Sequence, residues 1–92
     1  MENSAVAQAL RELAALLEQR GDNPFKIRAY RRAAREMDGL GVGLEQLVAE
    51  GRLGEIHGVG EAIAAKIQEL VTTGHLRAYD KLLADAPEKT PS

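Results

Sequence analysis

Apolar side chains recur every three or four residues along most of this chain, and glycines divide the pattern into segments. The first segment predicts a helix from about Ser4 to Arg20, with Ser4 as its cap and Gly21 as its stop. The second predicts a helix that Asn23-Pro24 opens and that ends just before Gly39. The expected inward-facing residues are Val6, Leu10, Leu13 and Leu17, then Ile27, Tyr30, Ala34 and Met37.

The second half of the chain predicts shorter helices around two glycine-rich segments. Residues 39–43 form the main internal loop. Helices are expected over about residues 44–50, 61–73 and 76–84, with one further turn over 52–56. Their expected inward-facing residues are Ile63, Ile67, Leu70 and Val71, then Leu76, Tyr79 and Leu82 or Leu83. Because no β-alternation occurs, we expect an all-α fold, a compact bundle of about five to six short helices.

Length and composition indicate one small domain. The chain has 92 residues, of which 45% are hydrophobic but only 3% aromatic, so aliphatic side chains must form the core. We expect the domain to span residues 1–86 and residues 87–92 to form a disordered tail or linker. There is no cysteine, and the two histidines are far apart, which argues against a catalytic metal site. No apolar run reaches the roughly 20 residues that cross a bilayer, so no membrane partner is expected.

The charge is distributed unevenly. The chain carries a net charge of −2, yet residues 23–35 contain no acidic residue and five basic ones. These are Lys26, Arg28, Arg31, Arg32 and Arg35. Such a segment can place a domain on a phosphate backbone, while the acidic remainder limits indiscriminate binding. The alternative is an ordinary solvated helix face.

A glycine hairpin precedes the longest helix of the second half. Gly58, Val59 and Gly60 lead directly into Glu61, the expected first helical residue. Two glycines let the main chain take positive φ angles and approach a ligand, while the helix start offers unpaired N–H groups. With the apolar residues on both sides, this pattern has the form of a helix-hairpin-helix motif, which contacts DNA phosphates without reading bases. A plain helix–helix turn remains the alternative.

Three segments together resemble the N-terminal domain of X-family DNA polymerases, which the β-type enzymes carry as a small lyase domain. They are residues 23–34, residues 58–67 and Thr73-Gly74-His75-Leu76, and the resemblance covers about residues 6–83. It implies a role in DNA repair, with single-stranded, gapped or 5′-phosphorylated DNA and other repair proteins as partners. Related domains occur in structure-specific nucleases. Polymerase activity is not expected in these residues, and the sequence leaves open whether they belong to a longer enzyme.

The resemblance also implies a catalytic lysine. Lys66 matches the residue that forms a Schiff base with the sugar at an abasic 5′ end and releases the strand by β-elimination. Its position beside Ile63 and Leu70 allows the stem to pack, and partial desolvation would favour the neutral amine. The plainer interpretation is a lysine that extends its ammonium to solvent.

The remaining site residues follow from the same resemblance. Lys26 and Tyr30 match members of the 5′-phosphate pocket of that family. Phe25 stands where animal enzymes have a histidine, and two further pocket lysines are replaced by Gly54 and Ala62. A monovalent cation, Na⁺ or K⁺, is implied at the backbone carbonyls of Ile56 and Val59, and no other cofactor is expected.

The sequence therefore allows three functions. The first is sequence-independent DNA binding through the hairpin and the basic segment. The second is 5′-deoxyribose-phosphate lyase activity, and the third is a helical protein-interaction module whose arginines meet an acidic partner. For the DNA-binding function we expect a monomer in the bacterial cytoplasm, associated with the nucleoid.

Overall fold

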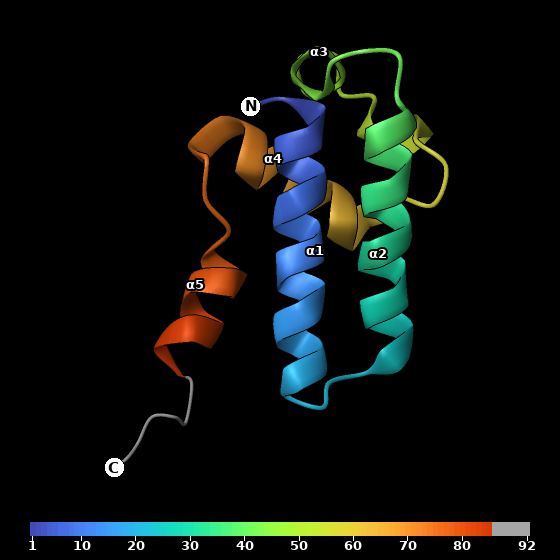
Figure 1. Cartoon of the computed structure of the whole chain (residues 1–92). Helices are drawn as coiled ribbons and strands as arrows, with labels where there is room; N and C mark the ends of the chain where they lie inside the picture. Colours follow the sequence, from blue (N-terminus) through green and yellow to red (C-terminus); the bar gives the residue numbers. More distant parts are fainter. Residues whose placement is uncertain (86–92) are drawn as a thin grey trace.

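The computed structural model describes residues 1–85, in which helices are joined by short loops (Figure 1). The elements are α1 (Asn3–Gln19), α2 (Pro24–Gly39), α3 (Leu44–Ala49), the 3₁₀ turn η1 (Leu53–Glu55), α4 (Glu61–Thr73) and α5 (Arg77–Ala84). Within residues 1–85 there is no strand, so the predicted all-α class is confirmed. The predicted tail over residues 87–92 lies outside the described residues.

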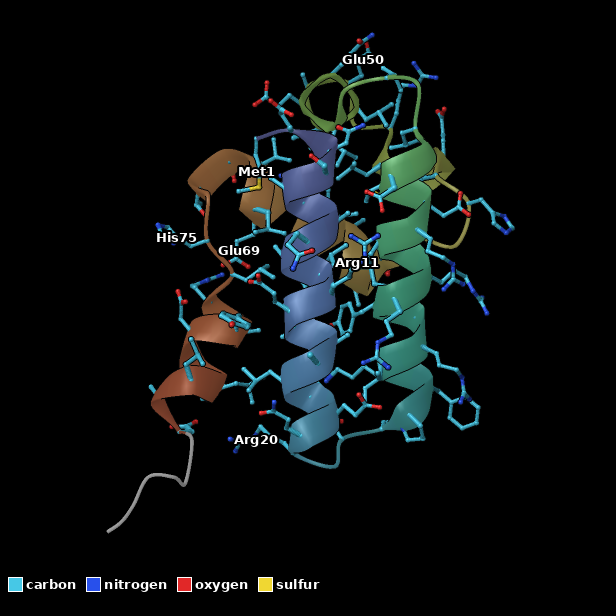
Figure 2. The ribbon with its side chains drawn as sticks, viewed as in Figure 1. Met1, Arg11, Arg20, Glu50, Glu69 and His75 are labelled. Carbon is cyan, nitrogen blue, oxygen red and sulfur yellow. The ribbon has the colours of Figure 1, made fainter. Side chains whose placement is uncertain are left out.

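Helices α1 and α2 form an antiparallel pair that carries most of the core (Figure 1). The turn between them is short, and the apolar stripes of both helices face each other. All eight predicted inward-facing residues of the pair are buried: Val6, Leu10, Leu13, Leu17, Ile27, Tyr30, Ala34 and Met37. Arg11 on the solvent side of α1 reaches toward α2, where it pairs with Asp38 (Figure 2).

The start of α1 differs from the prediction. Glu2 occupies the N-cap position without a side-chain cap, and Ser4 lies inside the first turn, so Ser4 is not the cap. The Asn3 side chain instead reaches the start of α3. Its amide nitrogen donates to the Val42 carbonyl (2.9 Å), and its oxygen accepts from the Leu44 N–H (2.9 Å). Asn3 therefore satisfies the first N–H of α3 and ties that helix to the start of α1.

The other helix ends agree with the prediction within about two residues. The Asn23 side chain accepts a hydrogen bond from the Phe25 N–H (2.9 Å) and caps α2, as predicted. Helix α2 continues through Gly39 instead of ending before it. Helix α4 has the predicted bounds and ends at Gly74, whose φ of 81° is the left-handed geometry of a glycine cap.

Helix α4 passes behind α1 and α2 in the view of Figure 1, and α5 lies beside α1. The inward residues of α4 are buried as predicted, except that Val71 is only half-buried. Helix α5 buries none of its own residues; Leu82 rather than Leu83 is the leucine that packs against the core. Its start is held by Glu69 of α4, which accepts from the Arg77 N–H (2.9 Å) and Nε (3.1 Å); Figure 2 shows Glu69 facing this connection. Within residues 1–85 no helix is long and apolar enough to span a membrane.

Candidate nucleic-acid interface

The predicted hairpin is a tight turn anchored in the core. The Ile56 carbonyl accepts from the Val59 N–H (3.2 Å), and both side chains are buried. Gly58 has a φ of 79°, which favours glycine, whereas Gly60 has a φ of −89° and an extended backbone. The expectation that both glycines take positive φ is therefore wrong for Gly60.

The N-terminus of α4 presents unpaired backbone donors. Gly60 is its N-cap, has no side chain to cap the helix, and its carbonyl accepts the first helical hydrogen bond, from Ala64 (2.9 Å). No acceptor within residues 1–85 pairs with the N–H groups of Glu61, Ala62 and Ile63. These donors and the positive end of the helix dipole suit an anion. The Glu61 carboxylate in the same turn opposes that preference.

Arg32 connects the hairpin with α2. A Cβ atom placed on Gly58 would lie 3.2 Å from Cδ and 3.5 Å from Cγ of Arg32, so the arginine stem lies directly against the glycine. A Cβ on Gly60 would meet no atom within 4 Å. The surface beside Gly60 is therefore open.

Three arginines on α2 form what we call the arginine stripe: Arg28, Arg32 and Arg35. Their spacing places them on one helix face, opposite the buried stripe, and all three are exposed. None of them forms an ion pair within residues 1–85. Arg31 differs, because it pairs with Glu18 (2.8 Å). That hydrogen bond lowers the pKa of Glu18 and raises the pKa of Arg31.

A second feature is a pocket of about 240 Å³ between α1, α2, α4 and α5, which we call the lysine pocket. Its polar lining consists of Asp22, Lys26, Tyr30, Lys66, Lys81 and Asp85, and its apolar lining of Leu13, Leu17, Ala78 and Leu82. Two lysines and the tyrosine were predicted to share a site, and the structure brings them together. The pocket lies apart from the arginine stripe, so the basic segment of α2 serves two different surfaces.

Tyr30 and Lys66 lie close together in this pocket. The Lys66 Nζ is 6.0 Å from the centre of the Tyr30 ring, which is close enough for a cation–π contact. Within residues 1–85, every fully buried side-chain polar atom has a hydrogen-bond partner. The Tyr30 hydroxyl has no partner there, so its oxygen is not fully buried. The hydroxyl oxygen therefore opens into the pocket. Burial raises the pKa of Tyr30, and the nearby charge of Lys26 opposes that shift, so the hydroxyl stays protonated at neutral pH.

The pocket departs from the family expectation in its lysines. Neither Gly54 nor Ala62 lines it, whereas Lys81 of α5 does. Lys81 was not predicted, because the apolar pattern of α5 indicated only a helix that packs on the core. Its spacing of three residues from Ala78 was the available signal, since residues three and four apart share a helix face.

The cation prediction at Ile56 and Val59 stays a prediction. No group of three or more histidine, aspartate or glutamate side chains within residues 1–85 could hold a metal ion. A backbone site depends on carbonyl oxygens instead. The Ile56 carbonyl already accepts one turn hydrogen bond, and each carbonyl oxygen has two lone pairs.

Comparison with known proteins agrees with this geometry. Residues 1–76 match the model of the helix-hairpin-helix domain family. The chain is also 26% identical over 88 residues to DNA polymerase/3′-5′ exonuclease PolX of Bacillus subtilis (strain 168). That match covers 96% of this chain and 15% of the relative, so the chain spans a small part of the relative's length. Helix α5 lies beyond the segment that the family model matches.

Proposed function

Because this chain belongs to the helix-hairpin-helix domain family, we propose that it binds the phosphate backbone of DNA without reading base sequence. The contact between Arg32 and Gly58 carries the proposal. In this contact the stem of one residue of the arginine stripe lies against the hairpin that leads into α4. One phosphate can then accept from the helix start while a neighbouring phosphate meets the arginines.

The charge distribution gives the hairpin and the arginine stripe different roles in this proposal. Glu61 weakens the attraction of the helix start for an anion, so the hairpin alone makes a poor phosphate site. Arg28 and Arg32 supply the missing positive charge from α2. The hairpin then fixes position through directional hydrogen bonds, and the arginines provide most of the salt-dependent affinity.

The preferred DNA structure is part of the same proposal. The relative with 26% identity is a DNA polymerase and 3′-5′ exonuclease, and both of these activities act at a 3′ end, as a gap provides. We therefore propose gapped DNA as the ligand, and the resemblance to X-family DNA polymerases adds DNA with a 5′-phosphorylated end. A Na⁺ or K⁺ ion at the carbonyls of Ile56 and Val59 would offset part of the charge of the bound phosphate.

Fluorescence anisotropy with two gapped DNAs of unrelated sequence tests this function. The proposal expects equal affinity for both DNAs and a steep loss of affinity as salt rises. A strong preference for one sequence would contradict backbone recognition. No binding to either DNA at low salt would favour the protein-interaction module instead.

A second function, 5′-deoxyribose-phosphate lyase activity, is favoured by the shared lining of the lysine pocket. The neutral Lys66 amine would attack the C1′ aldehyde, and loss of water would give the Schiff base. Removal of a C2′ proton and cleavage of the C3′–O bond would then release the strand with its 5′-phosphate. The protonated Tyr30 hydroxyl can donate a hydrogen bond in this pocket.

Borohydride reduction tests the lyase function. With DNA that carries a 5′ abasic sugar, the wild-type chain should give a covalent adduct, and Lys66→Ala should not. Lys26→Ala removes another lysine from the same pocket but leaves the nucleophile, so at saturating DNA it should still give the adduct. An adduct that persists in Lys66→Ala would show that Lys66 is not the nucleophile. The absence of an adduct with the wild-type chain would contradict lyase activity.

A further inference from the structure

The lysine pocket holds two carboxylates, those of Asp22 and Asp85, to which the proposed functions give no role. The elimination step needs a group that removes the C2′ proton, and Lys66 cannot act while it is joined to the sugar as a Schiff base. Tyr30 keeps its proton at neutral pH, and the other two lysines have no lone pair in their ammonium form. Among residues 1–85, the polar lining of the pocket therefore leaves the two carboxylates as proton acceptors.

The backbone of Asp22 is fixed by the end of α1. Gly21 takes the left-handed conformation, with a φ of 71°. The Asp22 N–H then donates to the Leu17 carbonyl (3.0 Å), the Schellman arrangement that ends many helices. Because α2 begins only two residues later, at Pro24, Asp22 lies between two helix ends at the edge of the pocket.

The two carboxylate oxygens of Asp22 have different surroundings. Oδ1 accepts a hydrogen bond from the Asn23 N–H (2.6 Å), which sets the direction of the carboxylate. Oδ2 lies 4.0 Å from the Lys26 Nζ, too far for a hydrogen bond, and accepts none within residues 1–85. An oriented carboxylate with one oxygen free of hydrogen bonds is suited to accept a proton from a bound substrate.

Asp22 also lies near the reacting amine. Burial raises the pKa of Tyr30, the charge of Lys26 opposes this shift, and the charge of Asp22 adds to it, so the carboxylate is close to the Tyr30 ring. The Lys66 Nζ is 6.0 Å from the centre of the same ring. The pocket is about 240 Å³, smaller than pockets that hold drug-sized ligands, so a sugar bound to Lys66 lies close to Asp22. No ion pair in the described part of the chain orients Asp85.

We propose that Asp22 is the catalytic base of the elimination step. This inference rests on the proposed lyase function. Oδ2 removes a proton from C2′ of the protonated Schiff base, and the C–H electron pair forms a C1′–C2′ double bond while the nitrogen becomes neutral. The electrons then return to the nitrogen side: the C1′–N double bond re-forms, a C2′–C3′ double bond forms, and the C3′–O bond breaks. Its electron pair leaves with the 5′-phosphate of the released strand. Asp22 passes its proton to water, and water hydrolyses the remaining Schiff base.

The test separates Schiff-base formation from elimination, with the full chain and DNA that carries a 5′ abasic sugar. Borohydride trapping measures the first step, and release of the downstream strand measures the second. Asp22→Asn keeps an oxygen that accepts from the Asn23 N–H but loses the base. It should form the trapped adduct as wild type does and release the strand about 100-fold more slowly. Asp85→Asn is the matched control, because it removes the other carboxylate of the pocket, and should slow release far less.

Deuterium at C2′ adds a readout that a merely structural role would not produce. Release from Asp22→Asn should show an isotope effect at least as large as that of wild type, because breaking the C2′–H bond then limits the rate. Release at the wild-type rate from Asp22→Asn, equal slowing in Asp85→Asn, or loss of the isotope effect overturns the role of Asp22, while adduct formation by wild type leaves the lyase function standing. No adduct with wild type contradicts the lyase function itself.

Discussion

The stem of Arg32 lies against Gly58, 3.2 Å from the position where a side chain at residue 58 would begin. This contact joins two parts of the chain that are far apart in sequence, the basic face of α2 and the hairpin before α4. Because Gly58 has no side chain, the stem of Arg32 can lie directly against the hairpin. The two parts of the proposed DNA interface therefore depend on each other for their geometry.

The two hairpin glycines should respond differently to substitution. Gly58→Ala places a side chain at positive φ and against Arg32, and should lower the free energy of unfolding by about 1–2 kcal/mol. At Gly60 there is open space for a methyl group and the φ is ordinary. Gly60→Ala should therefore lower the free energy of unfolding by at most about 1 kcal/mol, because alanine is a weaker N-cap than glycine. Its methyl group should nevertheless weaken DNA binding, because it keeps a phosphate from the backbone.

Urea unfolding of both variants checks the stability difference, and anisotropy checks the binding. If Gly60→Ala proved as destabilising as Gly58→Ala, the conformational difference between the glycines would be wrong. Full DNA affinity in a folded Gly60→Ala would argue against a phosphate at the hairpin.

Asn3 should matter more for stability than Ser4. Asn3→Ala removes two part-buried hydrogen bonds and leaves the Leu44 N–H and the Val42 carbonyl without this partner. The expected loss in the free energy of unfolding is about 1–3 kcal/mol. Ser4→Ala is the control, and should change it by less than about 0.5 kcal/mol since Ser4 does not cap the helix. The reverse order of effects would restore Ser4 as the cap.

Tyr30 should make the fold sensitive to alkaline pH. Burial raises the pKa of Tyr30 above its ordinary value of 10, so the folded state binds the phenolic proton more tightly than the unfolded state does. This contribution to stability is present below pH 10 and is lost as pH rises through the raised pKa. Tyr30→Phe cannot ionise and should therefore lose less stability between pH 8 and pH 11 than wild type. Urea titrations at both values check this, with Tyr79→Phe as the control; equal losses in wild type and Tyr30→Phe would contradict it.

Local signals were sufficient to predict most of the fold. The apolar period identified the buried stripes of α1 and α2, and Asn23 and Gly74 marked helix ends because their effects act within a few residues. The Asn3 bridge could not be predicted, since its partners lie about forty residues away. The φ of Gly60 was missed for a related reason: a glycine permits positive φ but does not require it.

The residues of the candidate site could be predicted from the sequence, but their division between two surfaces could not. Lys26 was expected both in the basic segment that meets the hairpin and, from the resemblance, in a pocket with Tyr30, and it lines the pocket. Helical spacing separates the two faces of α2, but only the packing of α4 and α5 shows what each face meets. Helical spacing puts Lys81 on the same face as Ala78, but only that packing shows that this face lines the pocket.

The most direct test of the DNA-binding proposal is the salt dependence of affinity for gapped DNA in Arg28→Ala/Arg32→Ala. The control is Arg20→Ala/Arg77→Ala, which removes the same charge away from the arginine stripe. We predict that the stripe variant binds more weakly than the control and that its slope of log affinity against log salt is shallower than wild type by about 1.8, for two lost duplex phosphate contacts. An affinity and slope that match the control would contradict the proposed interface.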